Sequence, residues 1–496
     1  MVDSAGPDNG APDRCADTDV NRGGGEEGDG ADRSHGRRTR HAVVVGGSLA
    51  GLLVAHVLTG HADRVTIVER DRLPDGPEPR AGVPQSRHTH VLLEGGQRAL
   101  DALLPGIVAE LREHGAPRLG MPSDLIQWQA RRFYRRTPAH VHILTGSRPQ
   151  LEWLVRRRVV ADPRITVVEG TEVVGLLGDR AQVRGVRLRE RGTRTRQETR
   201  PLTADLVVDA SGRGSRAPEW LSAIGAEPPR EETLDTGLAY ATRLYRAPAD
   251  AEEQRGLGYY FVAGRDHIYG GVALPTENGH CLVTLSGLRG SEPPSDEAGF
   301  TDFAARLPHP VLHEWLLKAE PLSPVHAFRA TANVRRRYDR PGRRPAGFLA
   351  TGDALCAVNP VYGQGMAVAA LGALALRDAL ADRRREPTTR RLQRAMLGAA
   401  RQAWGIASGA DRELPGARGD AARSRAADRI VARYLARVLE RAPGDPVVGA
   451  AFRSVFTLTA PVSVLFAPRI VRAVLFGPVL PSPPGPPMRP ESTETA

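Results

Sequence analysis

Asp353 is the side chain with the clearest chemical context in the chain. It follows a short apolar run, 347–351, which predicts a buried strand that ends at the carboxylate. After a loop come Gly363 and Gly365, and the alanine-rich run 366–381 then predicts a helix that begins near Gly365. A helix entered through glycines presents free backbone N–H groups and the positive end of its dipole to a ligand.

A carboxylate beside such a helix start indicates a ligand with hydroxyl groups and a partly anionic ring. Reduced flavin is such a ligand: Asp353 would bind a ribityl hydroxyl, and the helix start would face the pyrimidine edge. An ordinary strand–loop–helix joint with a glycine-rich bend explains the same residues. Taken alone, this segment leaves both interpretations open.

The beginning of the fold carries an independent signal for nucleotide binding. Residues 42–45 predict a buried strand, GGSLAG at 46–51 a turn, 52–58 a helix and 65–68 a second strand that ends at Glu69. Glycines allow the tight turn, the helix N-terminus binds the pyrophosphate, and a terminal acid binds ribose hydroxyls. Glu69 lies 23 residues after Gly46, close to the roughly 20 that is typical. The pattern therefore predicts a dinucleotide-binding unit in which serine replaces the second glycine.

Basic side chains in two later segments are further candidates. The Pro/Gly-rich loop 71–90 contains Arg80, which could reach a phosphate, together with His88 and His90. No carboxylate completes a metal site with the two histidines, and a solvated loop is the favoured interpretation for them. Arg148 precedes the predicted helix 151–160, where it could meet a cofactor.

The remaining pattern predicts an α/β fold with a separate antiparallel sheet and helices at the C-terminal end. The predicted strands after the first unit are 165–168, 172–176, 181–188, 205–209, 234–245, 258–262, 268–274 and 279–285. The predicted helices are 91–104, 300–317, 390–407 and 421–441. The predicted domains are a disordered tail at 1–40, a discontinuous Rossmann-like domain at 41–232 plus 330–385, a substrate-binding sheet domain at 233–329, a helical region at 386–480 and a tail at 481–496.

Composition narrows the classes of partner. The 496 residues carry a net charge of +11, but Lys318 is the only lysine and no arginine group lies in a nucleic-acid-binding motif. We therefore expect no nucleic acid partner. Cys15, Cys281 and Cys356 have no metal-like spacing, and no apolar leader is evident. These features predict a cytoplasmic protein without a metal site.

The segment 447–480 is unusually apolar, and proline and arginine interrupt it. Packing on the core is the favoured interpretation. Contact with a membrane surface or with an apolar substrate is the alternative.

Taken together, the glycine turn at 46–51, the strand ending in DASGRGSR at 209–216 and the late Gly-Asp with its glycine-rich helix start resemble the FAD-dependent monooxygenases of the para-hydroxybenzoate hydroxylase fold. The resemblance covers roughly residues 41–385. It implies a Rossmann-like FAD-binding domain, an antiparallel substrate layer and C-terminal helices. The cofactor-binding residues that it implies are Gly46, Gly47, Ser48, Ala50, Gly51, Glu69, Arg70, Arg80, Arg148, Val173, Asp353, Pro360, Gly363, Gly365 and Met366.

One position departs from the family pattern. The middle motif usually has Asp-Gly, tied to the use of both FAD and NADPH, and Ser211-Gly212 stands there. The departure puts direct NADPH binding in doubt. NADPH is still the expected reductant, and a separate flavin reductase is one way in which its electrons could reach the flavin.

At finer grain, GGSLAGL, PRAGVPQSRHTHVLL, VVDASGRGSR and NPVYGQGM resemble an actinobacterial branch that includes the polyene epoxidases of polyether ionophore pathways. The resemblance implies transfer of oxygen from dioxygen, through a flavin C4a-hydroperoxide, to the alkenes of a linear polyketide in antibiotic biosynthesis. Such chemistry needs no substrate deprotonation, and the flavin carries it, so no catalytic side chain is assigned.

Other activities on the same fold stay open. Aromatic hydroxylation and reduction of a prenyl chain are the alternatives, and a flavin-binding partner without turnover is a more distant one. A flavin halogenase of this family would need an active-site lysine after the first βαβ unit and a WxWxIP motif, and both are absent.

Overall fold

The computed structural model describes residues 39–192, 199–248, 258–265, 267–340, 342, 344–422 and 426–487. The predicted tail at 1–40 lies almost wholly outside the described residues, as does the end of the predicted tail at 481–496.

A five-stranded parallel sheet forms the centre of the nucleotide-binding half. Its strands are β1 His41–Val45, β2 Arg64–Val68, β8 Ile165–Val168, β12 Leu206–Asp209 and β21 Phe348–Ala350. The order is β21–β12–β1–β2–β8, and every neighbouring pair is parallel. All five positions of β1 are buried, as expected for a parallel strand covered on both faces. The predicted parallel strands are confirmed.

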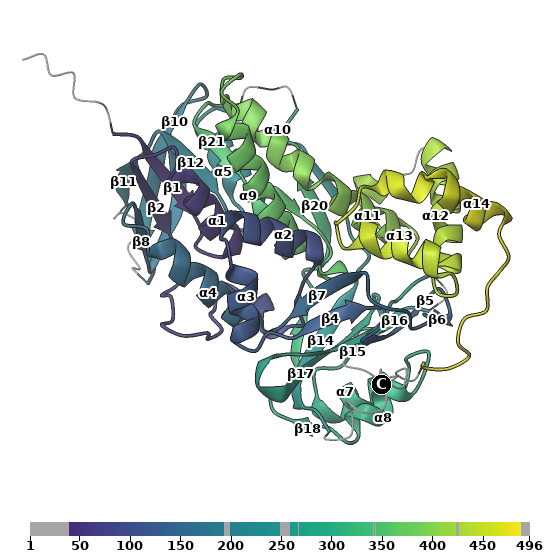
Figure 1. Cartoon of the computed structure of the whole chain (residues 1–496). Coiled ribbons are helices and arrows are strands. Elements are labelled where there is room, and N and C mark those ends of the chain that lie inside the picture. Colours follow the sequence, from purple (N-terminus) through teal and green to yellow (C-terminus); the bar gives the residue numbers. More distant parts are fainter. Residues whose placement is uncertain are drawn as a thin grey trace, which may run out of the picture. The chain divides into compact units, whose positions relative to one another are not determined.

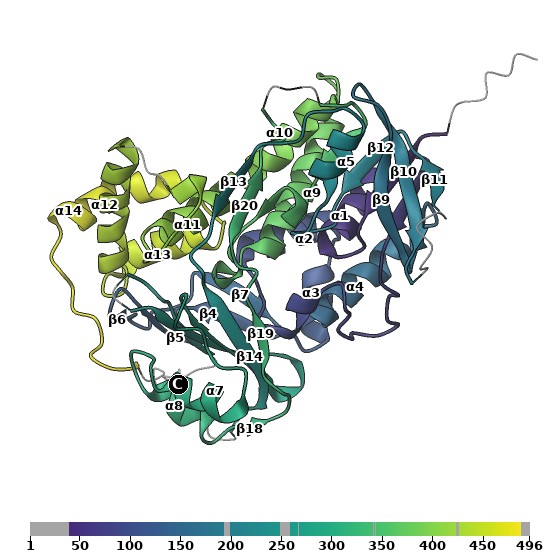
Figure 2. The same cartoon turned by 180° about the vertical axis from the view of Figure 1, so that it is seen from behind.

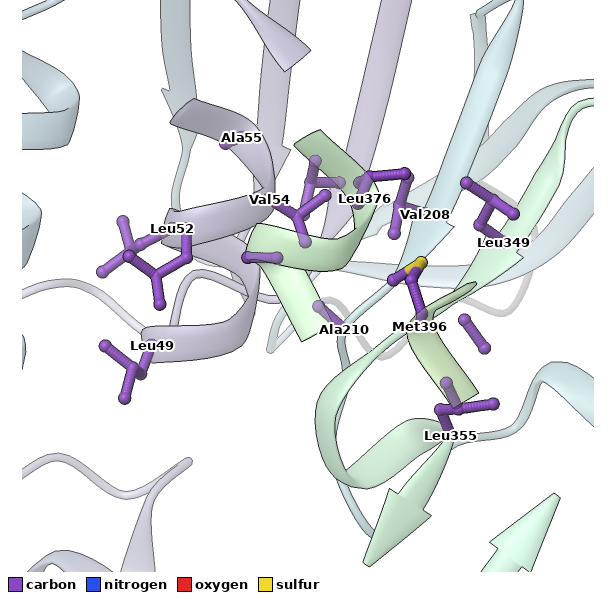
Figure 3. Close-up of a cluster of buried hydrophobic side chains, with 14 of the residues drawn as sticks. Leu49, Leu52, Val54, Ala55, Val208, Ala210, Leu349, Leu355, Leu376 and Met396 are labelled. Atoms are coloured by element: carbon purple, nitrogen blue, oxygen red, sulfur yellow. The ribbon is translucent and has the colours of Figure 1, made fainter. Parts of the chain in front are cut away.

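Helices pack on this sheet through a continuous apolar core (Figure 3). Val54 of α1 (Leu49–Leu58) lies beside Leu376 of α9 (Gly365–Ala381) and near Val208 of β12, whereas Leu49 and Leu52 belong to the same core on the other side of α1. The other helices of this half are α2 Glu94–Leu103, α3 Ile107–Glu113, α4 Arg148–Val160, α5 Ala217–Ala223 and α10 Thr389–Ala399. Both views show α9 running beside α1 (Figures 1 and 2). The core therefore holds the start of the chain's fold and the segment around Asp353 together.

An eight-stranded mixed sheet forms the second layer. Its order is β18–β14–β17–β16–β15–β5–β6, and β19 also pairs with β14. The strands are β5 Leu125–Gln129, β6 Arg132–Phe133, β14 Ala239–Arg246, β15 Gly258–Phe261, β16 Tyr269–Pro275, β17 His280–Gly287, β18 Glu320–Pro321 and β19 His326–Phe328. All pairs are antiparallel except β5 with β15. Two separate stretches of the chain, 125–133 and 239–328, build this sheet, and the sequence predicted strands only in the second stretch.

One face of the eight-stranded sheet is covered by α7 (Glu297–Ala304) and α8 (Val311–Leu316) through Phe300, Phe303 and Trp315. The prediction of one helix over 300–317 is wrong, because Pro310 stands immediately before α8 and a proline disrupts a helix interior. The opposite face of the sheet is left for the pocket described below.

Three small sheets complete the fold. They are β11–β10–β9, β13–β20–β22 and β3–β7–β4. The bounds are β3 Val91–Leu92, β4 Arg118–Met121, β7 Val141–Thr145, β9 Thr171–Gly178, β10 Val183–Glu190, β11 Arg200–Thr203, β13 Glu231–Leu234, β20 Asn333–Arg336 and β22 Cys356–Ala357. Short 3-10 turns cover Pro84–Arg87, Glu277–Gly279, Gly352–Ala354, Pro360–Tyr362, Asp420–Ala422 and Val462–Phe466.

Two predicted elements are corrected by these sheets. The predicted helix 91–104 begins only at Glu94, because Val91 and Leu92 pair with β7. The predicted strand 234–245 is two strands, β13 and β14, because Gly237 has a φ of 67° and breaks the extended backbone.

The C-terminal region is helical, as predicted. It contains α11 Arg401–Arg412, α12 Ala426–Arg441, α13 Pro446–Phe456 and α14 Pro468–Phe476. The predicted helix 390–407 is divided between α10 and α11 at Ala400. Val448, Val455 and Ile470 form a separate apolar cluster. Among the described residues, no helix is long and apolar enough to cross a membrane.

Candidate functional site

The turn after β1 requires two of its predicted glycines. Gly46 has a φ of 103°, and a Cβ there would lie 2.7 Å from the carbonyl oxygen of Ala210. A Cβ on Gly51 would lie 1.9 Å from the carbonyl oxygen of Gly46. The turn therefore brings α1 directly against the ends of β1 and β12. Ser48 is the N-cap of α1 but makes no side-chain cap, so the first amides of the helix stay available to an anion.

The Glu69 carboxylate is buried and already bound on both oxygens. Oε2 accepts from the amide of Gly47 at 2.7 Å, and Oε1 accepts from the amide of Asp71 at 2.9 Å. Arg80 lies 3.2 Å from the same Oε1. In this structure, then, Glu69 ties the glycine turn to the strand beside it.

Arg80 and Arg148 meet at a carboxylate that the sequence analysis did not assign, that of Glu152. Glu152 Oε1 accepts from Nε and Nη2 of Arg80 at 2.9 and 2.8 Å, and Oε2 accepts from Ser48 Oγ at 2.6 Å and from Arg148 Nη2 at 3.1 Å. Arg148 Nη2 also donates to Ser48 Oγ at 2.8 Å. Burial raises the pKa of Glu152, but Arg148 and Arg80 outweigh it and hold this pKa below its usual range. Three predicted site residues thus lie in one cluster in front of α1.

A sequence signal for Glu152 existed. It lies one helical turn after Arg148 and forms an i,i+4 pair with it. The sequence alone does not show that Glu152 is also bound by Arg80 and Ser48, because these residues lie far from it in the chain.

Asp353 lies in the 3-10 turn that follows β21, beside α1: a Cβ on neighbouring Gly352 would meet Ala50 Cβ at 2.7 Å. In the part of the chain that the structure describes, the Asp353 carboxylate has no hydrogen-bond partner. Burial raises its pKa, and Arg213 and Arg148 act in the opposite direction. An unpaired carboxylate in this position fits a ligand that donates hydroxyl hydrogen bonds.

The predicted helix start at Gly365 is confirmed as the first residue of α9. Gln364 precedes it without a side-chain cap, and a Cβ on Gly365 would meet nothing within 4 Å. Met366 and Arg148 line a small cavity together with His90. The α9 N-terminus therefore opens onto free space next to the arginine cluster, as a bound ring would need.

A larger pocket of about 840 Å³, including its opening to solvent, lies between the eight-stranded sheet and the turn Pro360–Tyr362. Pro360, Val361, Tyr362 and Gly363 line one side. The rest of the lining is mainly apolar: Val91, Leu93, Met121, Leu125, Ile143, Val272, Leu274 and Phe456. A Cβ on Gly363 would lie 2.4 Å from Val91 Cγ2, which explains why glycine stands at this wall.

A row of side chains, polar except for Val272, crosses the pocket face of the sheet. The strand register places Gln127, Tyr260, Val272, Thr284 and Thr242 side by side on five neighbouring strands. Tyr260 and Thr284 line the pocket. The apolar cavity therefore has a hydrogen-bonding strip along its floor.

His88 joins this strip from the loop. Its Nδ1 lies 2.8 Å from Thr242 Oγ1, which lies 2.6 Å from Thr284 Oγ1, and Thr89 Oγ1 also meets Thr284 at 2.8 Å. Burial lowers the pKa of His88 to about 3, and nearby His90, His326 and Arg87 act in the same direction. The prediction that His88 lies in a solvated loop is wrong, because His88 is buried in the pocket wall.

Two predicted residues lie apart from these groups. Arg70 is exposed and donates to the carbonyl oxygen of Gly82 at 3.2 Å. Val173 is buried on β9 within the core of the nucleotide-binding half. Their cofactor contacts stay predictions.

The donor set fits FAD. The uncapped start of α1 after Ser48 would hold the pyrophosphate, Asp353 the ribityl chain, and Pro360, Gly363, Gly365 and Met366 the ring. The amides of Gly46 and Gly47 and both oxygens of Glu69 are bonded within the protein, so their contacts with the cofactor stay predictions. Among the described residues, no cluster could hold a metal ion.

Comparison with known proteins agrees with this chemistry. The FAD binding domain family model matches residues 39–407. Protein Rv3254 of Mycobacterium tuberculosis is 36% identical over 357 residues, which cover 68% of this chain and 73% of that protein. The 6-methylpretetramide 4-monooxygenase of Streptomyces rimosus is 36% identical over 180 residues, which cover 35% of this chain and 38% of the enzyme. The crystal structure of p-nitrophenol 4-monooxygenase from Pseudomonas putida superposes with a TM-score of 0.60 at 16% identity, covering 85% of this chain and 99% of that one.

These matches confirm the expected mixed α/β fold, the FAD-binding domain and the resemblance to FAD-dependent monooxygenases. The finer likeness to polyene epoxidases stays a prediction. The chain therefore belongs to the FAD binding domain family and has the fold of its FAD-dependent monooxygenases.

Proposed function

We propose that the protein is an FAD-dependent monooxygenase that epoxidises alkenes of a linear polyketide, as in polyether antibiotic biosynthesis. The pocket next to Pro360 and Gly363 carries the proposal, because most side chains that line it are apolar. An extended, weakly polar chain suits such a lining. The reaction consumes dioxygen and two reducing equivalents, places one oxygen atom on the alkene and releases the other as water.

The chain's own residues would bind, orient and exclude water. FAD, when bound, supplies the activation of dioxygen. The α9 N-terminus, opening at Gly365, would stabilise negative charge on the reduced ring. Leu125, Val272 and Phe456 would keep water from the reacting alkene and hold one of its faces toward the ring.

Aromatic hydroxylation is the second candidate, and His88 is the observation that favours it. The hydrogen-bonded group of His88, Thr242 and Thr284 beside the pocket could hydrogen-bond to a phenol and position it at the pocket floor. The Streptomyces relative named above is a 4-monooxygenase of 6-methylpretetramide by its name. Reduction of a prenyl chain is a third candidate, for which the pocket's apolar character is the only support.

Ser211 bears on the source of electrons. Its amide and hydroxyl both bond to Asp209, which is fully buried. Ser211 is exposed, but its amide and hydroxyl hydrogens, where the family pattern has the carboxylate of Asp-Gly, are committed to Asp209. We propose NADPH as the reductant, delivered through a separate flavin reductase.

The test uses labelled dioxygen, FAD, NADPH and a flavin reductase with two substrates, a linear polyene polyketide and a phenolic polyketide. Epoxidation predicts one labelled oxygen atom for each alkene oxidised, in a product that acid opens to a diol. Label only in a phenolic product would favour hydroxylation, and a gain of two hydrogen atoms would favour reduction. Omitting the reductase should stop turnover; undiminished turnover would contradict the proposed electron supply.

A further inference from the structure

A buried carboxylate from the C-terminal region holds the turn that faces the pocket. Asp411 lies on α11, beyond the residues that the family model matches. Its Oδ1 accepts from the Tyr362 hydroxyl at 2.6 Å, and its Oδ2 accepts from Asn333 Nδ2 at 2.6 Å and from Asn359 Nδ2 at 3.1 Å. Asp411, Asn333 and Asn359 are 0% exposed.

The same cluster fixes the backbone of the turn. The amide of Asn359 donates to Asn333 Oδ1 at 2.7 Å, and the amide of Val361 donates to Asn359 Oδ1 at 3.2 Å. Pro360 and Val361, which these bonds place, line the pocket. The Tyr362 hydroxyl is committed to Asp411, so this side chain offers its ring rather than its hydroxyl to a ligand.

Such a cluster is costly to build. Among the described residues, Asp411 forms no ion pair, and neutral donors alone satisfy it. Burial raises its pKa, whereas the bonds from Tyr362, Asn359 and Asn333 act to lower it. A well-packed apolar contact would hold two elements together at a lower desolvation cost. The carboxylate is better explained as an orienting group. Its hydrogen bonds from Tyr362, Asn333 and Asn359 fix the positions of these three side chains relative to one another.

We propose that Asp411 is a positioning residue for the flavin-facing turn, and that it fixes the wall shared by the ring and the substrate through Asn359 and Tyr362. The inference rests on the proposed use of FAD at this turn. The proposal gives the end of α11, which lies beyond the residues matched by the family model, a role in oxygen transfer.

The test compares the single variant Asp411→Asn with an exchange variant that combines Asn333→Asp and Asp411→Asn. In the single variant one oxygen replaces two at unchanged volume: if it accepts from Asn333 and Asn359, the Tyr362 hydroxyl hydrogen loses its acceptor, and if it accepts from Tyr362, the new amide opposes those of Asn333 and Asn359. In the exchange variant the carboxylate introduced at position 333 accepts from the new amide, and the amide oxygen at position 411 still accepts from Tyr362. We expect Asp411→Asn to weaken FAD binding at least fivefold, shift the visible flavin spectrum and lower the product formed per NADPH at least threefold. The exchange should recover at least half of each effect.

Two further variants keep the result interpretable. Tyr362→Phe removes one donor and should shift the flavin spectrum in the same direction by a smaller amount, even if Asp411→Asn does not fold. Asp445→Ala removes the N-cap of α13 and should lower thermal stability without moving the spectrum. A wild-type spectrum and coupling in Asp411→Asn, or an equal shift in Asp445→Ala, would overturn the proposal. FAD affinity and spectrum are measured without substrate, so they decide this point even if no substrate is oxidised.

Discussion

Two carboxylates at strand ends, buried Glu69 and partly buried Asp353, differ in what their oxygens already bind. Glu69 accepts from two backbone amides and pairs with Arg80. Asp353 has no hydrogen-bond partner among the described residues. Removing the Glu69 carboxylate therefore breaks contacts within the protein, whereas removing the Asp353 carboxylate deletes a group that no other side chain or backbone group of the described residues binds.

We expect Asp353→Ala to weaken FAD binding roughly 10- to 100-fold, the worth of one or two hydrogen bonds to a charged group. The apoprotein should be as stable as the wild type or more stable, because a partly buried carboxylate without a partner in the protein is lost. Fluorescence titration with FAD and thermal unfolding of the apoprotein measure both. Glu69→Gln is the comparison and should destabilise the apoprotein. Full retention of FAD by Asp353→Ala would remove Asp353 from the site.

His88 gives a prediction about acid stability. The folded-state pKa of His88 is about 3, below its ordinary value of 6.5, so the unfolded chain binds the proton more readily. The stabilisation is present above pH 6.5 and is lost as the pH falls toward 3. Between pH 7.5 and pH 5 the loss is about 2 kcal/mol for this 4% exposed side chain.

Urea unfolding at pH 7.5 and pH 5 measures this loss. His88→Gln should make the difference between the two pH values smaller by about that amount, whereas the exposed His114→Gln should leave it unchanged. Equal pH dependence in wild type and His88→Gln would show that His88 is not the group concerned.

At the scale of elements, the start of α9 can be tested without disturbing the fold. A Cβ on Gly365 meets nothing within 4 Å, and one on Gly372 of the same helix comes no closer than 4.0 Å to Thr351 Oγ1. Both glycine-to-alanine substitutions should stabilise the apoprotein by about 0.5–1 kcal/mol. Only Gly365→Ala should weaken FAD binding, because its methyl group enters the space assigned to the ring. Equal FAD affinity in the two variants would contradict that assignment.

The elements also show what sequence patterns can and cannot predict. The strand 42–45 and the helix start at Gly365 were predicted because short-range signals, an apolar run and a glycine-rich entry, define them. The strand β5 was missed, because its partner β15 lies more than 120 residues further along the chain. Asp411 was missed for the same reason: its partner Asn359 lies 52 residues away in sequence. Local patterns locate the cofactor-binding turns, and contacts between distant segments complete the pocket.

At the scale of the whole molecule, exposed apolar side chains are concentrated in the C-terminal helices. Of the nine large apolar side chains that are exposed in the described part of the chain, seven lie between 430 and 479. Ile430 is 73% exposed and Phe476 81%. Exposed Arg469 and Arg472 lie on the same helix as Phe476. Apolar side chains beside arginines complement an anionic lipid surface.

We propose peripheral contact of 447–480 with anionic membranes, which would bring an apolar substrate close to Phe456 in the pocket wall. The protein should sediment with vesicles that contain phosphatidylglycerol and less with pure phosphatidylcholine. Reversing Arg469 and Arg472 to glutamate should remove that preference, since each arginine near such a surface contributes about 1 kcal/mol. Phe476→Ser should weaken binding to both vesicles, whereas Leu317→Ser, at a 66% exposed position on a different element, should not. An equal loss of vesicle binding in Phe476→Ser and Leu317→Ser would contradict a membrane-facing surface, and so would a wild-type protein that sediments with neither vesicle. A change of oligomeric state in Phe476→Ser would instead indicate that this surface contacts a second copy of the chain.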